Sequence, residues 1–136
     1  MNYVIFDLEA TCWENNYQDR VQEIIEIGAY RLTAFGEITG EYNRFVKPLL
    51  HPDLSIYCRE LTSITQEEID RAMSFKQVIE EFQDWAAIFE EEYLLCSWGN
   101  FDRRQLVSDC KLHDLDFEWA HQHINLKSQY QEMKKL

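Results

Sequence analysis

The chain opens with an apolar run that ends in two acids. Residues 3–6 read Tyr-Val-Ile-Phe without a polar interruption, which is typical of a strand buried on both faces. Asp7 and Glu9 then fall at the tip of this strand. Because side chains alternate along an extended segment, the two carboxylates are expected to point to the same side, about 6 to 7 Å apart.

A second β-rich segment covers residues 21–32, with Gly28 expected to mark a bulge or a close backbone approach. A turn at residues 34–37 returns the chain into a third segment, 38–46, and the pattern predicts a hairpin. Pro48 ends that strand, because proline cannot donate to a strand ladder.

Two capping boxes predict helix starts. Thr65 with Glu68 opens a short helix, and Ser74 with Gln77 opens a longer one. Behind the second box, apolar side chains recur at helical spacing and are expected to face the core, while the acids between them face water. The apolar stripe consists of Phe75, Val78, Ile79, Phe82, Trp85, Ala86 and Phe89, and the acids are Glu80, Glu81 and Asp84.

A second short apolar strand at residues 93–97 precedes a predicted helix at about 102–110, with Leu106 and Val107 facing inward. The strand, helix, strand order predicts that 93–97 lies parallel beside the first strand. Functional crevices of open α/β sheets lie off the carboxyl ends of the strands, so Asp102 is expected near Asp7.

The last segment of the chain adds one more strand and one more helix to the prediction. Residues 123–127 read as a strand, and a helix is expected to open at Ser128 with Gln131 three residues on.

Composition fits one globular domain over residues 1–136, since 46% of the residues are hydrophobic and 14% are aromatic. No apolar run is long enough for a membrane helix and no targeting leader is visible, so we expect a soluble, cytoplasmic protein without membrane contact. The four cysteines, Cys12, Cys58, Cys96 and Cys110, show no zinc-ligand spacing and read as isolated reduced thiols.

The net charge of -12 argues against a protein that grips nucleic acid over a broad basic face. It does not exclude an enzyme that binds a few terminal nucleotides while metal ions neutralise the phosphate. Asp7 and Glu9 together suit hard divalent cations. Two plainer readings stay open: solvated acids at the end of a strand, and, for Asp102, an ordinary acid in the first turn of a helix.

Four motifs carry a family resemblance: D-L-E-A-T-C at 7–12, L-T-S-I-T at 61–65, W-G-N-F-D-R-R-Q-L at 98–106 and I-N-L-K at 124–127. In this order they resemble the DEDDh 3'-5' exonucleases, a family with a ribonuclease H-like fold. Cys12, where members more often carry Gly, is similar to the branch of Eri-type exoribonucleases and KapD-like proteins.

The resemblance implies an α/β fold whose mixed sheet combines an antiparallel hairpin with parallel strands and is flanked by helices. It implies a 3'-5' exonuclease that binds the 3' end of single-stranded RNA, or DNA, and releases nucleoside 5'-monophosphates by two-metal-ion hydrolysis with Mg²⁺ or Mn²⁺. Asp7 would bridge the two ions, Glu9 would hold the ion on the nucleophile's side, and Asp102 would support the second.

The resemblance also implies contacts to the terminal nucleotides. Backbone groups at Ala10 and Thr11 would meet the terminal sugar, and Leu61, Trp98 and Phe101 would stack on or wedge the last bases. For these three side chains, simple packing in the core is the alternative.

The chain departs from the family in one respect, because no H-x-x-x-x-D segment follows the fifth strand. His113 has Glu118 at the right interval, but ahead of that strand, and all four histidines read as ordinary surface or packing residues. We expect a fold incomplete at its C-terminal end, with weak metal binding, slow or absent hydrolysis, and an apolar face that invites self-association. The alternative function is a catalytically silent regulatory or protein-binding module.

Overall fold

The computed structural model describes residues 1–15 and 19–135, and they form one six-stranded mixed sheet in the order β4-β3-β2-β1-β5-β6. Strands β1, β2 and β3 pair antiparallel, whereas β5 pairs parallel with β1, β6 with β5, and β4 with β3. The bounds are β1 Asn2–Ala10, β2 Ile24–Leu32, β3 Ile38–Lys47, β4 Met73–Ser74, β5 Tyr93–Ser97 and β6 His123–Asn125. The predicted mixed sheet and the parallel neighbour of β1 are confirmed.

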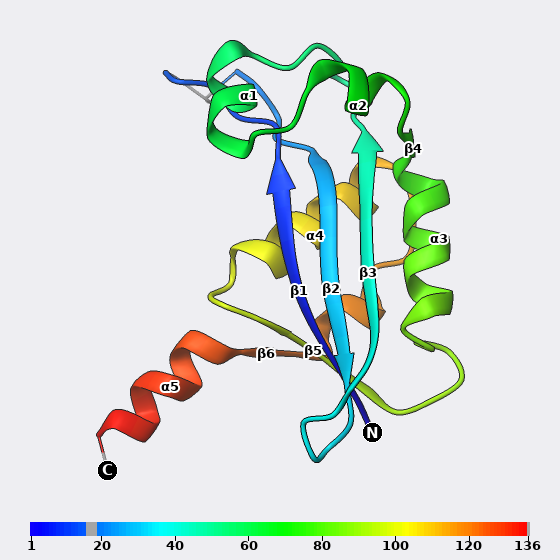
Figure 1. The fold of residues 1–136 in the computed structure, drawn as a ribbon, viewed down its shortest axis with the longest axis vertical. Coiled ribbons are helices and arrows are strands. Elements are labelled where there is room, and N and C mark those ends of the chain that lie inside the picture. The colour runs from blue at the N-terminus through cyan, green and yellow to red at the C-terminus, as the bar shows by residue number, and fades with distance from the viewer. Residues whose placement is uncertain (16–18, 136) are drawn as a thin grey trace.

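Strand β1 is buried on one face only, so the prediction of a strand buried on both faces is wrong. Val4, Phe6 and Leu8 are buried, while Ile5 and Asp7 are exposed. Helix α4 lies behind the sheet and leaves the front of β1, β2 and β3 uncovered (Figure 1). The strand also continues through both acids to Ala10, because Leu8 and Ala10 extend the buried row and keep their pairing with β2.

The hairpin of β2 and β3 is confirmed, with Gly36 at φ 82° in the connecting turn. Gly28 forms no bulge, contrary to expectation, since it pairs with Asp7 on one side and Asn43 on the other in unbroken register. An added Cβ would meet the Asn43 Nδ2 at 3.5 Å, an ordinary contact. The irregularities lie instead between Glu9 and Ala10 and between Arg31 and Leu32.

Both predicted capping boxes are present at the starts of α2 (Gln66–Asp70) and α3 (Phe75–Trp85). Helix α1 (Ile56–Thr62) was not predicted, and its cap is the Ser55 side chain, which accepts from the Cys58 N–H at 3.0 Å. The apolar stripe of α3 is confirmed except at Phe89, which is exposed. Helix α3 has already ended there, and Ala87, at φ 55°, turns the chain away.

Helix α4 (Phe101–Leu112) is confirmed, and a 3-10 turn, η1 (Glu118–His121), follows it. The predicted strand at 123–127 ends early, at Asn125, and helix α5 (Leu126–Lys134) begins ahead of the predicted cap at Ser128. The reason is the Asn125 side chain, which accepts from the N–H groups of Lys127 and Ser128. Helix α5 projects from the sheet with no buried residue (Figure 1).

The described residues contain neither a membrane-spanning helix nor a disulfide bond. None of their helices combines the length and the apolar character needed to span a bilayer. All four cysteines are buried and carry free thiols.

A buried carboxylate ties α4 to the start of β2. Asp109 is 1% exposed and accepts from the Ile24 N–H at 2.9 Å and from the Gln105 amide at 2.6 Å. The same Gln105 amide donates to the Gln22 carbonyl at 2.9 Å. Burial, with the smaller effect of the Glu23 charge, raises the pKa of Asp109 to about 7, against the opposing effect of its two hydrogen bonds.

Replacing this carboxylate tests its effect on stability. The ordinary pKa of the group is 3.8 and the native pKa is about 7, so the native state binds the proton more tightly and the free energy of unfolding falls as pH rises between these values. The side chain introduced by Asp109→Asn cannot titrate. Between these two pH values the free energy of unfolding of the native protein is therefore expected to fall by up to about 4 kcal/mol more than that of the variant. Urea unfolding at several pH values measures the difference.

The matched control is Asp114→Asn, at an exposed acid whose left-handed backbone also suits Asn. It should follow the native pH profile. Parallel profiles for the native protein and Asp109→Asn would contradict the role given to Asp109.

Candidate active site

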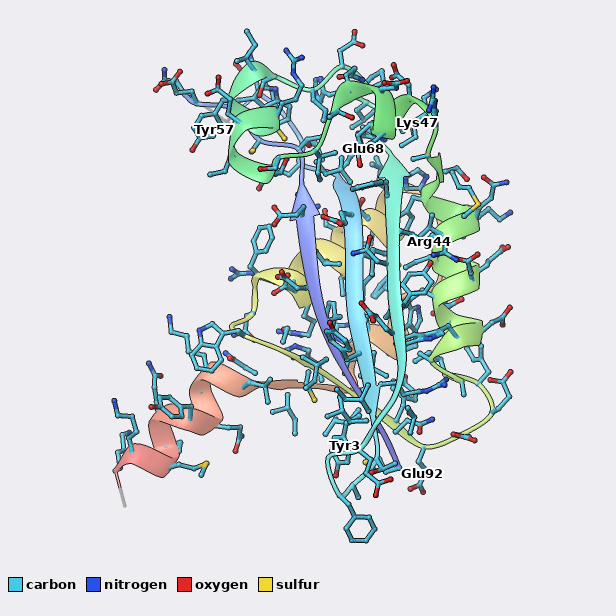
Figure 2. The ribbon with its side chains drawn as sticks, viewed as in Figure 1. Tyr3, Arg44, Lys47, Tyr57, Glu68 and Glu92 are labelled. Atoms are coloured by element: carbon cyan, nitrogen blue, oxygen red, sulfur yellow. The ribbon has the colours of Figure 1, made fainter. Side chains whose placement is uncertain are left out.

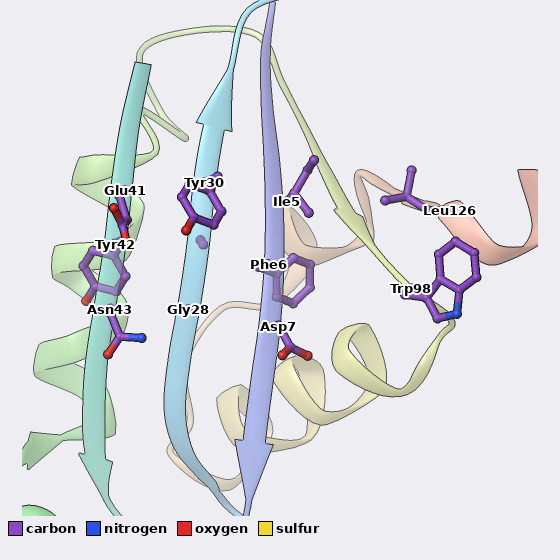
Figure 3. Close-up of a pocket in the computed structure, with 11 residues that line it drawn as sticks. Ile5, Phe6, Asp7, Gly28, Tyr30, Glu41, Tyr42, Asn43, Trp98 and Leu126 are labelled. Carbon is purple, nitrogen blue, oxygen red and sulfur yellow. The ribbon is translucent and has the colours of Figure 1, made fainter. Parts of the chain in front are cut away.

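The two acids of β1 share the open face of the sheet, as predicted. Asp7 is exposed and Glu9 is half-buried, while Phe6, Leu8 and Ala10 alternate with them on the buried face. Figure 3 shows Asp7 pointing from β1 to the side on which Trp98 lies. Asp7 is a cross-strand neighbour of Gly28, whose missing side chain leaves the space beside this carboxylate open.

Asp102 joins this pair through the backbone of β1. Strand β5 pairs with β1 only as far as Ile5 and Cys96, so further along β1 an edge is left without a strand partner. The Leu8 N–H lies beyond that point and donates to the Asp102 Oδ1 at 3.0 Å. The first turn of α4 therefore places its carboxylate between the positions of Asp7 and Glu9, and Asp102 is only 6% exposed. Asp102 is thus an acid in the first turn of a helix, and its carboxylate is buried against β1 rather than solvated.

A further carboxylate, Glu26, was missed from the sequence. It lies directly opposite Glu9 in the β1–β2 register and is half-buried. The alternation of polar and apolar residues in β2 was a signal for its face, but the partner of Glu9 depends on the register, and the register shifts between Glu9 and Ala10. Like charges directly opposite on a sheet repel each other.

These acids carry negative charge that no salt bridge among the described residues balances. The pKa of Glu9 is raised, first by burial and then by the charges of Asp7, Glu26 and Asp102. The pKa of Asp102 is raised by burial and by Asp7, against the opposing effect of the hydrogen bond from Leu8. A cation among these oxygens would oppose both shifts, because it favours the ionised carboxylates.

The donor set fits hard divalent ions, since every candidate ligand is a carboxylate. In the described residues, however, no three His, Cys, Asp or Glu side chains are already gathered closely enough to hold a metal ion. The charges of Asp7, Glu26 and Asp102 each raise the pKa of Glu9, and Asp102 is held against the Leu8 N–H. Metal binding would draw the carboxylates of Asp7, Glu9 and Asp102 together.

The end of β1 is held rigidly by Glu23. The Thr11 N–H donates to the Glu23 carbonyl at 2.8 Å, and the Thr11 hydroxyl accepts from the Glu23 N–H at 2.9 Å. The buried Glu23 carboxylate in turn accepts from the N–H groups of Leu49 and Leu50, both at 2.6 Å. The sugar contact at Ala10 and Thr11 stays a prediction, and the Thr11 N–H is not free to make it.

The three predicted base-contacting side chains lie at the surface, so core packing does not account for them. Leu61 on α1 is 64% exposed, Trp98 in the β5–α4 connection is 61% exposed, and Phe101 at the start of α4 is 42% exposed. Trp98 lines an open hollow of about 630 Å³ that Asp7 also borders (Figure 3). The Trp98 ring lies 5.9 Å from that of Tyr130 on α5.

The histidine side chains contact residues other than the three acids of the candidate site. In residues 1–15 and 19–135, none of the four hydrogen-bonds to Asp7, Glu9 or Asp102. His113 stacks on Phe75 with ring centroids 5.1 Å apart, as expected of a packing residue. His123 pairs with the buried Ser97 hydroxyl at 2.7 Å, and burial, aided by the Arg103 charge, lowers its pKa.

Comparison with known proteins relates the chain to nucleases. The profile of a family described as "Exonuclease" matches residues 4–135. The chain is 35% identical over 133 residues to human 3'-5' exoribonuclease 1, covering 93% of this chain and 38% of that protein. It is 33% identical over 139 residues to bovine ERI1 exoribonuclease 3, covering 94% and 40%. The chain thus spans about two fifths of the length of these relatives.

Solved structures agree with this relationship. The nuclease domain of 3'hExo, a DEDDh family member bound to rAMP, matches with a TM-score of 0.91 and 34% identity, over 99% of this chain and 71% of that one. Cell-death related nuclease 4 matches with a TM-score of 0.87 and 29% identity, over 98% and 48%. Exonuclease I of E. coli, at 14% identity and a TM-score of 0.68 over 87% and 25%, shares the fold alone. The chain therefore belongs to the exonuclease family that includes the DEDDh 3'-5' exoribonucleases.

Proposed function

We propose that this chain is a 3'-5' exoribonuclease that removes nucleoside 5'-monophosphates from the 3' end of single-stranded RNA. The observation that carries the proposal is the hydrogen bond from Leu8 to Asp102, which brings an acid of α4 between the two acids of β1. Support comes from human 3'-5' exoribonuclease 1, named for this activity, and from a related 3'-exonuclease solved in a study of 3'-end recognition of the histone mRNA stem-loop.

Asp7, Glu9 and Asp102 would hold two divalent ions, Mg²⁺ or Mn²⁺. When bound, such a pair supplies an activated water and stabilises the departing 3'-oxygen. The exposed rings of Trp98 and Phe101 would then orient the last bases by stacking. Because no histidine of the described residues hydrogen-bonds to these acids, we expect hydrolysis to be slower than in an enzyme with a positioned general base.

The metal role is tested with Asp7→Asn and Asp102→Asn. The side chain introduced by Asp102→Asn keeps an oxygen for the Leu8 N–H but loses the charge, so the fold should survive while Mn²⁺ binding by isothermal titration falls at least tenfold in each variant. Mn²⁺-dependent release of nucleotides from 5'-labelled RNA and DNA oligonucleotides should fall in parallel, by about 10²-fold or more.

Asp84→Asn, at an exposed acid of α3, is the control and should behave as the native chain does. Unchanged Mn²⁺ affinity in Asp7→Asn would remove the metal role from these acids. A native chain that binds no Mn²⁺ and hydrolyses neither polymer would favour the alternative function, a catalytically silent regulatory or protein-binding module on the same fold.

Glu26→Gln tests the repulsion between the acids. Without metal, removing the charge opposite Glu9 is expected to stabilise the protein by about 0.2 to 1 kcal/mol at pH 7. It should also lower the pKa of Glu9, since Glu26 is one of the charges that raise it. Urea unfolding in EDTA measures the first effect and carboxyl NMR titration measures the second. At pH 3, where carboxylates are largely protonated, the stability gain should vanish, and a gain that persists would contradict the electrostatic cause.

We also propose that the exposed apolar side chains of α5, together with Trp98, support weak self-association. Tyr130 and Met133 of α5 are 51% and 68% exposed, and Trp98 lies beside Tyr130. Exposed apolar side chains gathered in this way favour burial against another molecule.

Light scattering tests self-association. The mean mass of the native chain should rise above 16.4 kDa with concentration, and Tyr130→Glu/Met133→Glu should suppress the rise because it places charge on the patch. A mass that stays at the monomer value at all concentrations would contradict the proposal.

A further inference from the structure

The basic residues of this acidic chain are concentrated near its C-terminal end. Residues 103–136 contain six Lys or Arg and five Asp or Glu, whereas residues 1–102 contain seven and twenty. The last segment is therefore net positive by one charge, while the first 102 residues carry a net charge of -13. Three of its six bases, Arg103, Arg104 and Lys111, lie on α4, and the other three lie on α5 or at its end.

The fold collects the basic residues 103–111 into a groove between α4 and η1. The groove encloses about 370 Å³, and its lining contains three cationic side chains and no acidic one. Arg104, Lys111 and His121 are exposed and Arg103 is half-buried. The lining residues are Arg103, Arg104, Val107, Ser108, Lys111 and His121.

Two of the three cationic side chains of this groove, Lys111 and Arg103, are positioned by contacts with aromatic rings. The Lys111 ammonium lies 5.0 Å from the centroid of the Phe117 ring, and Phe117 meets His121 edge to face with ring centroids 5.9 Å apart. The Arg103 Nη1 lies 3.5 Å from the His121 Nδ1. Groups held in place before a ligand arrives lose less conformational entropy on binding.

The groove cations are also free of ion pairs. The salt bridges among the described residues are Arg44–Glu81, Arg71–Glu67 and Lys135–Glu132, and none involves Arg103, Arg104 or Lys111. Their charge is therefore available to an anion. Guanidinium groups bind phosphate oxygens through two parallel N–H bonds, and an ammonium group binds them as a point charge.

The groove starts next to the candidate active site. Asp102, on the inward side of the first turn of α4, immediately precedes Arg103. From Arg103 to Lys111 the helix rises about 12 Å, at 1.5 Å per residue. A strand whose 3' end lies at the acids on the open face of the sheet would pass around the first turn of α4 to reach the three cations on the outward side of this helix.

We infer that the α4–η1 groove binds the phosphodiester backbone of the RNA on the 5' side of the nucleotide being removed. The direction of the bound strand rests on the proposed function, whereas the recognition of phosphates by Arg103, Arg104 and Lys111 does not. The groove would thus supply affinity for longer substrates, and the acids would act on the terminal nucleotide.

The test compares Arg104→Gln/Lys111→Gln with Lys47→Gln/Lys76→Gln. Both double variants remove two exposed positive charges. Lys47 lies at the end of β3, toward the β4 edge of the sheet (Figure 2), and Lys76 lies on α3. The main probe is a 5'-labelled 12-nucleotide RNA with a 3'-phosphate, whose blocked end separates backbone binding from hydrolysis. Fluorescence anisotropy without metal, over a range of salt concentrations, gives its affinity.

The groove variant is expected to bind the blocked RNA about tenfold more weakly, and the slope of log affinity against log salt should shrink by about 1.4, for two lost phosphate contacts on a single strand. The control variant should change affinity less than twofold. Equal losses in the two variants would overturn the inference in favour of nonspecific charge attraction. A second outcome would also overturn it. If polyglutamate of matched charge displaces the blocked RNA as effectively as unlabelled RNA does, the groove fits an acidic protein partner instead.

A second substrate keeps this inference separate from the proposed function. Mn²⁺-dependent cleavage of a dinucleotide, which is too short to follow the groove, should fall much less in the groove variant than cleavage of an unblocked 12-nucleotide RNA. If the native chain cleaves the dinucleotide but does not bind the blocked RNA, the inference about the groove is overturned and the exonuclease proposal stands. Groove-dependent binding of the blocked RNA without any cleavage would overturn the exonuclease proposal alone.

Discussion

The hydrogen bond from the Leu8 N–H to the Asp102 carboxylate is the interaction on which the arrangement of the site depends. It forms because β5 is shorter than β1, so that part of β1 has no strand on that side to accept its N–H groups. A buried N–H without an acceptor is costly. The first turn of α4 supplies that acceptor and thereby fixes an acid beside Asp7 and Glu9. One backbone group thus links the end of the parallel pairing to the geometry of the carboxylates.

The same helix carries opposite charges on opposite sides. Its inward side presents Asp102 and Asp109, each of which accepts a hydrogen bond from a backbone N–H group of the sheet. Its outward side presents Arg104 and Lys111 to the groove beside η1. Helix α4 is therefore both the structural support of the acids and the wall of the basic groove. The net charge of the chain does not reveal that acids and bases lie on opposite sides of this helix, because acids outnumber bases in the chain as a whole.

Local signals predicted the elements that depend on neighbours in sequence. The capping boxes at Thr65 and Ser74 were found where predicted, because each involves side chain and backbone groups within four residues. The predicted start of α5 at Ser128 was wrong, because Asn125 caps the helix three residues earlier. Helix α1 was missed because its single Ser55 cap lacks the reciprocal Glu or Gln. The uncovered face of β1 was missed because an unbroken apolar run does not reveal whether a second layer covers it.

The sequence by itself determined the order of the five longer strands and of the helices α2 to α5, the pairing of β1 with β5 and the identity of three candidate acids, because these follow from periodicity, crossover topology and motif spacing. Only the tertiary structure decided that Glu26 faces Glu9, that Asp109 is buried against the Ile24 N–H, and that Arg104 and Lys111 share a groove with His121. Each of these juxtapositions depends on register or on the packing of elements distant in sequence, and neither quantity is encoded within a local stretch of the chain.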